Sequence, residues 1–166
     1  MRKISLLLFS IAVISASVLS VAPSVADAKS GVTISQAWVR SSSYSDHVGG
    51  MTGVFASITN RTAHAITLLG GNTNVASTVQ THQVVNGLMS QKSGGFKIAK
   101  GATLVLQPGG LHLMLMGLNR PILAGDSIVF TFKFMGAQAR TLKLIAKPVV
   151  AGGEVYSPSP IPSTGN

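Results

Sequence analysis

The sequence of 166 residues contains no cysteine. This absence excludes a disulfide framework, a cysteine nucleophile, a lipid carried on cysteine and a zinc site with thiolate ligands. It also excludes a blue-copper electron-transfer centre, because such a centre has a cysteine sulfur in its trigonal plane. A folded domain formed by this chain must therefore be held together by its apolar core.

Acidic residues are also scarce, with four in the whole chain against thirteen Lys and Arg. Beyond residue 28 the acids are Asp46, Asp126 and Glu154, which fall in predicted loops or in the C-terminal tail. A pair of catalytic carboxylates is therefore not expected. The sequence also lacks a nucleophile-elbow motif and a glycine-rich phosphate loop that opens a helix. We predict that the protein is not an enzyme.

The few acidic residues leave the chain with a formal net charge of +9. A basic balance of this size is typical of proteins that bind nucleic acid, anionic lipid or an acidic protein. The basic residues are scattered and do not alternate with aromatic ones, and export argues against nucleic acid as a partner. We interpret the charge as electrostatic association with a membrane or cell-wall surface, or as attraction of an acidic protein partner.

The first 28 residues have the pattern of a signal peptide. Arg2 and Lys3 precede an apolar stretch over residues 4–22, and Ala26-Asp27-Ala28 gives a small-residue exit. We predict cleavage near Ala28 and an exported, extracytoplasmic protein. The apolar stretch is also nearly as long as a membrane-spanning helix, so retention as an anchor is the alternative.

Residues 29–149 are predicted to form one β-domain, and residues 150–166, rich in Gly, Pro and Ser, a disordered tail. Within the domain, short β-type segments alternate with turn residues, and sustained helical periodicity is absent. This spacing predicts an all-β sandwich or barrel with Greek-key connections. The expected strands are 32–39, 51–59, 64–69, 75–85 (followed by the hairpin dipeptide Asn86-Gly87), 88–91, 96–100, 102–106, 109–118, 128–134 and 141–146.

The segment from Gly109 to Leu118 (GGLHLMLMGL) carries the most informative pattern. In an extended chain its alternate leucines point to one face, while His112, Met114 and Met116 point to the other. Imidazole and thioether are donors that suit Cu(I). The alternative interpretation is that both faces are buried and the methionines fill gaps in the core.

Further soft donors lie on other predicted strands. His82 stands within the strand 75–85, Met89 follows the next turn and can return beside that strand, and Met51 opens the second strand. Each of these residues alone is more often structural than a ligand. Their occurrence together with His112 and Met114 predicts a Cu(I) site that draws on two imidazoles and one or more thioethers.

The span 32–147 resembles the periplasmic copper chaperone family written PCu(A)C. The family signature is a His, a Met about eleven residues later, and then a His-x-Met. His82 matches the first His, and His112 with Met114 match the His-x-Met. Further matching segments are Ala37-Trp38-Val39-Arg40, Ser57-Ile58-Thr59-Asn60, Ile98–Leu106 and Pro108-Gly109-Gly110.

The middle Met of the signature has no direct counterpart in this chain. Ser93 stands eleven residues after His82, and Met89 reaches the family position only through a gap in the hairpin. Met51 is the candidate substitute, because the opening Met-Thr-Gly-Val-Phe looks like that of family members from Gram-positive bacteria. Met116 is a spare donor that the signature does not require.

The resemblance implies a cupredoxin-like or immunoglobulin-like Greek-key β-sandwich. It further implies an exported Cu(I) metallochaperone whose acceptor is the copper subunit of the terminal respiratory oxidase. We expect a shallow, exposed site at one end of the sandwich, because an exposed ion of low coordination passes readily to the ligands of an acceptor. The alternative from another functional class is a non-metal exported β-domain that acts as a cell-surface or cell-wall interaction module.

Overall fold

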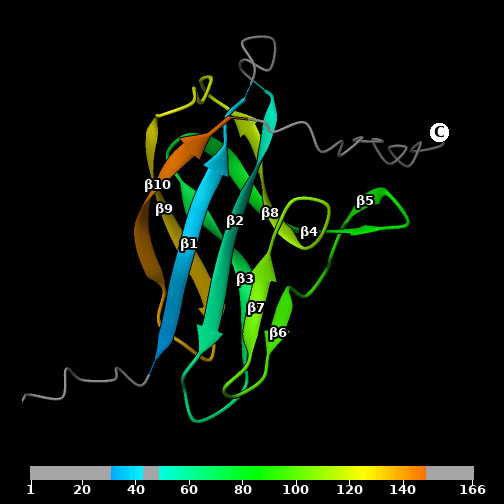
Figure 1. The fold of residues 1–166 in the computed structure, drawn as a ribbon, viewed down its shortest axis with the longest axis vertical. Helices are drawn as coiled ribbons and strands as arrows, with labels where there is room; N and C mark the ends of the chain where they lie inside the picture. The colour runs from blue at the N-terminus through cyan, green and yellow to red at the C-terminus, as the bar shows by residue number, and fades with distance from the viewer. Residues whose placement is uncertain (1–30, 43–48, 149–166) are drawn as a thin grey trace, which may run out of the picture.

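The computed structural model describes residues 31–42 and 49–148, and within these ranges the chain consists of β-strands and connecting turns (Figure 1). The prediction of an all-β fold is confirmed. The predicted signal peptide and the predicted C-terminal tail lie outside the described residues. The described part contains no helix that is long and apolar enough to cross a membrane. The strands are β1 (Val32–Arg40), β2 (Met51–Asn60), β3 (Ile66–Thr73), β4 (Ala76–Val85), β5 (Leu88–Gln91), β6 (Phe96–Ile98), β7 (Thr103–Leu106), β8 (His112–Leu118), β9 (Ser127–Met135) and β10 (Arg140–Lys147).

All of these strands belong to one mixed sheet. Its order is β5-β4-β8-β2-β1-β10-β9-β3-β6, and β7 pairs with the later part of β2. The pairing of β1 with β10 is parallel, whereas the other strand pairings, such as β1 with β2 and β4 with β8, are antiparallel. Neighbours such as β8 and β2 are far apart in sequence, which agrees with the crossover connections of a Greek-key arrangement.

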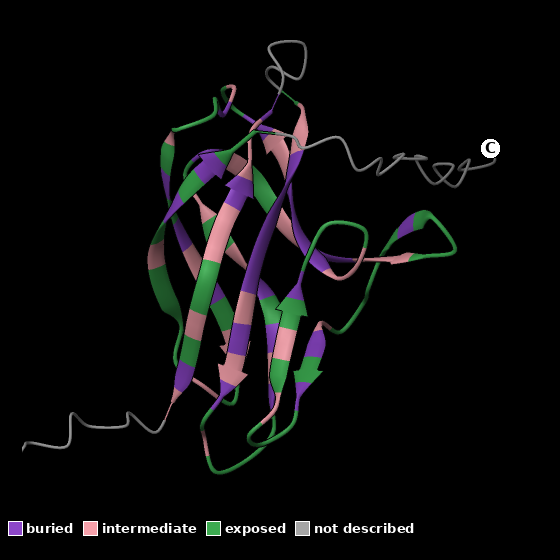
Figure 2. Cartoon of the chain, in the orientation of Figure 1, coloured by how far each residue is buried: buried purple, intermediate pink, exposed green. Residues whose placement is uncertain are grey.

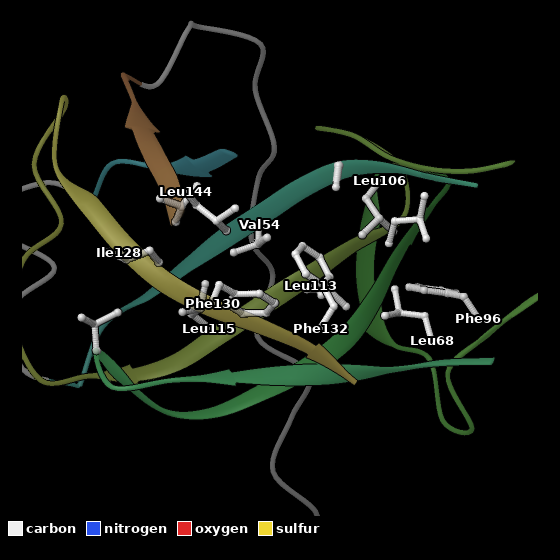
Figure 3. Close-up of a cluster of buried hydrophobic side chains, with 14 of the residues drawn as sticks. Val54, Leu68, Phe96, Leu106, Leu113, Leu115, Ile128, Phe130, Phe132 and Leu144 are labelled. Carbon is white, nitrogen blue, oxygen red and sulfur yellow. The ribbon is translucent and has the colours of Figure 1, made fainter. Parts of the chain in front are cut away.

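The apolar core lies where the two halves of this curled sheet face each other (Figure 3). Val54 of β2 and Leu113 of β8 belong to the same cluster as Phe130 and Phe132 of β9 and Leu144 of β10. Burying a side chain of this size stabilises the fold by roughly 1.5–3 kcal/mol. In a chain without disulfides, this cluster supplies the main stabilisation.

A bulge in β1 decides which side chains of that strand face the core. Pairing with β2 shifts by one residue between Ser35 and Trp38, and Gln36 inside the bulge has a left-handed backbone (φ 52°). Beyond the bulge, Val39 points into the core, while Trp38 pairs with Phe55 on the opposite face. The bulge therefore moves the one tryptophan of the chain out of the main core.

The expected end of the third strand near Gly70 is wrong. β3 continues to Thr73 and pairs with β9 across a second register shift at Leu68 and Gly70. A Cβ atom at Gly71 would lie 2.4 Å from the Phe130 ring. Gly70 and Gly71 therefore belong to a strand, and Gly71 permits close packing of an aromatic ring, although in sequence the pair looks like a turn.

The hairpin between β4 and β5 is confirmed, with Asn86 and Gly87 at φ 52° and 76° as its two turn residues. In Figure 1 this hairpin extends to one side of the main body. Val85 and Leu88, which flank the turn, are exposed. The hairpin places β5 at an edge of the sheet, next to the strand that carries His82.

Candidate metal centre

Three buried apolar side chains lie outside the main core cluster, namely Phe55, Met89 and Met114. These side chains lie on β2, β5 and β8. The buried His112 is also on β8, and the buried His82 is on β4, between β5 and β8 in the sheet. β2 and β8 are buried along most of their length, on both faces (Figure 2). The molecule therefore has a second buried cluster, on the face of β5, β4, β8 and β2 that is turned away from the core.

The sheet register brings the two histidines together. His82 of β4 and His112 of β8 are direct cross-strand partners, and their ring centroids are 5.7 Å apart. Met114 is two residues from His112 on the same face and lies between Gln80 of β4 and Gly53 of β2. The sequence prediction that His82, His112 and Met114 converge therefore agrees with the strand register.

The expectation of a shallow, exposed site is wrong for these side chains. Their exposed fractions are 0% for His112, 5% for Met114, 6% for His82 and 8% for Met89. For Met114 the physical reason lies on its partner strand β2, where a Cβ atom at Gly53 would come within 2.7 Å of the Phe55 ring. The missing side chain at Gly53 lets this ring lie flat along the sheet beside Met114.

A row of rings crosses four strands next to the methionines. The centroid of the Phe55 ring is 4.5 Å from that of Trp38 on β1 and 6.2 Å from that of His112 on β8. The Arg40 guanidinium lies 5.3 Å from the Phe55 centroid, and the Lys147 ammonium lies 5.4 Å from that of Trp38. The two cations therefore lie over the aromatic rings of β1 and β2, and the two imidazoles form the other end of the row.

Each histidine holds its proton on one nitrogen and keeps a lone pair on the other. His82 Nε2 donates to Gln80 Oε1 at 3.0 Å, and His112 Nδ1 donates to the carbonyl oxygen of Gly110 at 3.1 Å. The lone pairs then sit on Nδ1 of His82 and Nε2 of His112, and both of these atoms are buried. A metal ion requires this arrangement, since it binds the unprotonated nitrogen while the other nitrogen is oriented by a hydrogen bond.

Burial lowers the pKa of His82 below its ordinary value of about 6.5, and the neighbouring His112 lowers it further. The folded protein therefore binds fewer protons than the unfolded chain as the pH falls below that value. We expect the free energy of unfolding of the metal-free protein to decrease as the pH falls below about 6.5. In the His82→Gln variant the free energy of unfolding should decrease less over the same pH range. Urea unfolding at a series of pH values checks this; equal pH profiles for the two proteins would contradict it.

The remaining predicted ligands are divided between two places. Met89 of β5 pairs with Val84, which puts it on the His82 face, two positions along the strand from that residue. Met51 instead pairs with Met116. Met116 is four residues from His112 along β8, or about 13 Å. The structure therefore groups Met89 with the imidazoles and separates Met51 from them.

Carboxylates do not contribute to this cluster. Within residues 31–42 and 49–148 there is no group of three or more His, Cys, Asp or Glu that could hold a metal ion. The acid of the described part, Asp126, forms an ion pair with Arg120 at 2.9 Å. The soft donors nearest to His82 and His112 on the same face are the thioether sulfurs of Met114 and Met89.

Sequence reasoning did not identify Gln80, Gly53 and Phe55 as parts of the site. Gln80 is two residues from His82 on an alternating strand, and this spacing is a usable sign of a supporting residue. No comparable sign exists for Phe55, because its ring reaches the cluster only through the close approach over Gly53.

The described residues define an all-β domain with a buried histidine–methionine cluster outside its main core. Such a fold is shared with the copper-bound PCuAC domain of PmoF2, which is 16% identical, with a TM-score of 0.62 over 71% of this chain and 93% of that domain. It is shared also with apo-DR1885 of Deinococcus radiodurans, which is 23% identical, with a TM-score of 0.51 over 92% of this chain and all of that one. The resemblance to PCu(A)C domains is thus confirmed.

The chain belongs to the LpqE-like family, whose model, described as "Putative lipoprotein LpqE-like", matches residues 32–146. A relative named "Putative lipoprotein Lxx21020", from Leifsonia xyli subsp. xyli, is 35% identical over 130 residues, which are 76% of this chain and 75% of the relative. The residues that match the family model, 32–146, include all of the buried histidine–methionine cluster. The word lipoprotein in the descriptions of this family and of this relative agrees with the predicted export of the protein.

Proposed function

We propose that this protein is a copper chaperone that binds Cu(I) through His82, His112 and Met114. The observation that carries the proposal is the direct cross-strand pairing of the two histidines, with Met114 on the same buried face. The shared fold with a PCuAC domain that was solved with copper supports it. A set of two imidazoles and a thioether in a chain without cysteine has few other uses as a metal site.

The donors favour Cu(I) over other metal ions. Thioethers and neutral imidazoles carry no charge, so a monovalent soft ion can be buried among them at lower cost than a divalent one. Zn(II) prefers imidazole, carboxylate and thiolate, and Cu(II) prefers tetragonal nitrogen and oxygen donors. The cluster offers neither carboxylate nor thiolate.

Met89 is the residue that best completes the ligand set. It is buried outside the main core, lies on the His82 face and belongs to the edge hairpin. A ligand on an edge hairpin can separate from the histidines without disturbing the core, because β5 is paired on one side only. This arrangement gives a buried site a means of releasing its ion.

We expect the protein to bind one equivalent of Cu(I) in a reducing buffer that contains a competing coloured chelator. Met89→Leu should weaken the affinity about tenfold or more, while Met51→Leu should change it by less than about twofold. Both substitutions conserve side-chain volume, which makes them matched controls for each other. A second readout is the fluorescence of Trp38, whose ring stacks on Phe55 beside the site.

Two results would contradict this assignment. An unmodified protein that leaves all Cu(I) with the chelator would overturn the copper function and favour the non-metal surface module. Strong loss of affinity in Met51→Leu, with normal affinity in Met89→Leu, would show that Met51 completes the ligand set in place of Met89.

The cellular role follows from the resemblance to the copper chaperones. We infer that the protein acts outside the cytoplasmic membrane and delivers Cu(I) to the copper subunit of the terminal respiratory oxidase. The predicted signal peptide and the relatives named as lipoproteins support the location. The net charge of +9 favours an acceptor with an acidic docking surface, or an anionic membrane or wall surface nearby.

A further inference from the structure

The inner donor cluster (His82, His112, Met114 and Met89) is almost completely buried. A copper ion in water therefore has little direct access to these side chains. The ring of Phe55 covers the cluster on its β2 side, above Gly53. A route for the ion that leaves the hairpin between β4 and β5 in place can reach the cluster from a neighbouring position on the same sheet face.

The next residues along this face are two further methionines. Met51 of β2 and Met116 of β8 are direct cross-strand partners, and Met116 is two residues from Met114 on the same strand. Both are partly exposed, in contrast to the inner donors. Side chains of direct partners have Cβ atoms about 4.5–5.5 Å apart, so two flexible thioethers there can bind one ion between them.

We propose that Met51 and Met116, the outer methionine pair, form a second, weaker Cu(I) site through which copper reaches the inner donor cluster. This inference rests on the proposed function, since it describes how that site is loaded. The two sites are continuous, because Met116 and Met114 project from the same face of β8 about 7 Å apart along the strand. On the β4 side of Met116 stands Thr78, which brings no competing soft donor.

The transfer is an exchange of ligands. The ion leaves its external donor as Met51 and Met116 sulfurs bind it, then exchanges these thioethers for Met114 and the two imidazoles. The copper stays Cu(I) throughout, and no proton moves at the thioethers because they carry none. Two neutral sulfurs bind more weakly than the inner set with its imidazoles, so the ion moves inward.

The test compares rate with affinity in the double variant Met51→Leu/Met116→Leu. Loading is followed in a stopped-flow instrument by the loss of colour as Cu(I) leaves a bicinchoninate complex for the protein. We expect loading to slow about tenfold or more, while the equilibrium affinity stays within about twofold. The control is Met135→Leu on β9, because Met135 is 61% exposed and lies on a strand remote from β8 in the sheet.

Each outcome has a separate meaning. Unchanged loading in the double variant, with normal affinity, would overturn the outer pair and leave the proposed function intact. A parallel loss of affinity and rate would also overturn it, because Met51 or Met116 would then belong to the principal site. Failure of the unmodified protein to take Cu(I) would instead refute the proposed function. Thermal unfolding of each variant, monitored by circular dichroism, verifies that the fold is retained.

Discussion

Replacing Met114 by Leu should lower the affinity for Cu(I) about 100-fold or more, and His112→Ala should have at least as large an effect. Either change removes a donor from a small ligand set in which no carboxylate or cysteine can take its place. The measurement is competition with a Cu(I) chelator under reducing conditions. Leucine conserves the volume of Met114, so this variant separates ligand loss from loss of packing.

Two substitutions outside the cluster serve as controls for this experiment. His64, which contacts the Gly136 carbonyl, and Met135 on β9 carry the same donor types but lie away from the inner donor cluster. We expect His64→Ala and Met135→Leu to bind Cu(I) as the unmodified protein does. Undiminished binding in Met114→Leu and His112→Ala would refute the assigned site.

Replacing Asn60 by Ala should lower the free energy of unfolding by about 3 kcal/mol or more. The Asn60 side chain is fully buried at the end of β2. Its Nδ2 group donates to the carbonyl oxygens of His64, Ile98 and Ala99, at 2.8, 3.0 and 3.2 Å. Its Oδ1 atom accepts from the backbone N–H and the hydroxyl of Thr62, at 2.9 and 2.7 Å.

Alanine at this position would remove these five hydrogen bonds together, including the buried one to the carbonyl oxygen of Ile98, and this accounts for the size of the effect. The loss is a large share of the total stability of a domain this small. Urea unfolding gives the value. The control is Thr103→Ala, which removes only the exposed hydroxyl pair between Thr103 and Thr59 and should change stability by less than about 0.5 kcal/mol. Equal stabilities of the two variants would contradict the role assigned to Asn60.

Local pattern was sufficient to predict most of the strands. Turn dipeptides such as Asn86-Gly87 have one strongly preferred conformation, and their effect does not depend on distant residues. The alternation in the segment 109–118 also predicted correctly that His112 and Met114 share a face, because the side-chain period of a strand is fixed by its backbone. The interruption expected at Gly70 and Gly71 was wrong, since only the contact of Gly71 with Phe130 shows why glycine occurs within this strand.

By itself, the sequence determined the chemistry that this protein can use. Without cysteine and with hardly any carboxylate, its soft donors are imidazole and thioether, whichever way the chain folds. Only the tertiary structure decided which donors meet and whether water reaches them. Strand register joined His82 to His112 across β4 and β8 and placed Met51 beside Met116. The bulge at Gln36 and the absence of a side chain at Gly53 brought aromatic rings over the site, because register and close approach depend on partners that are distant in the sequence.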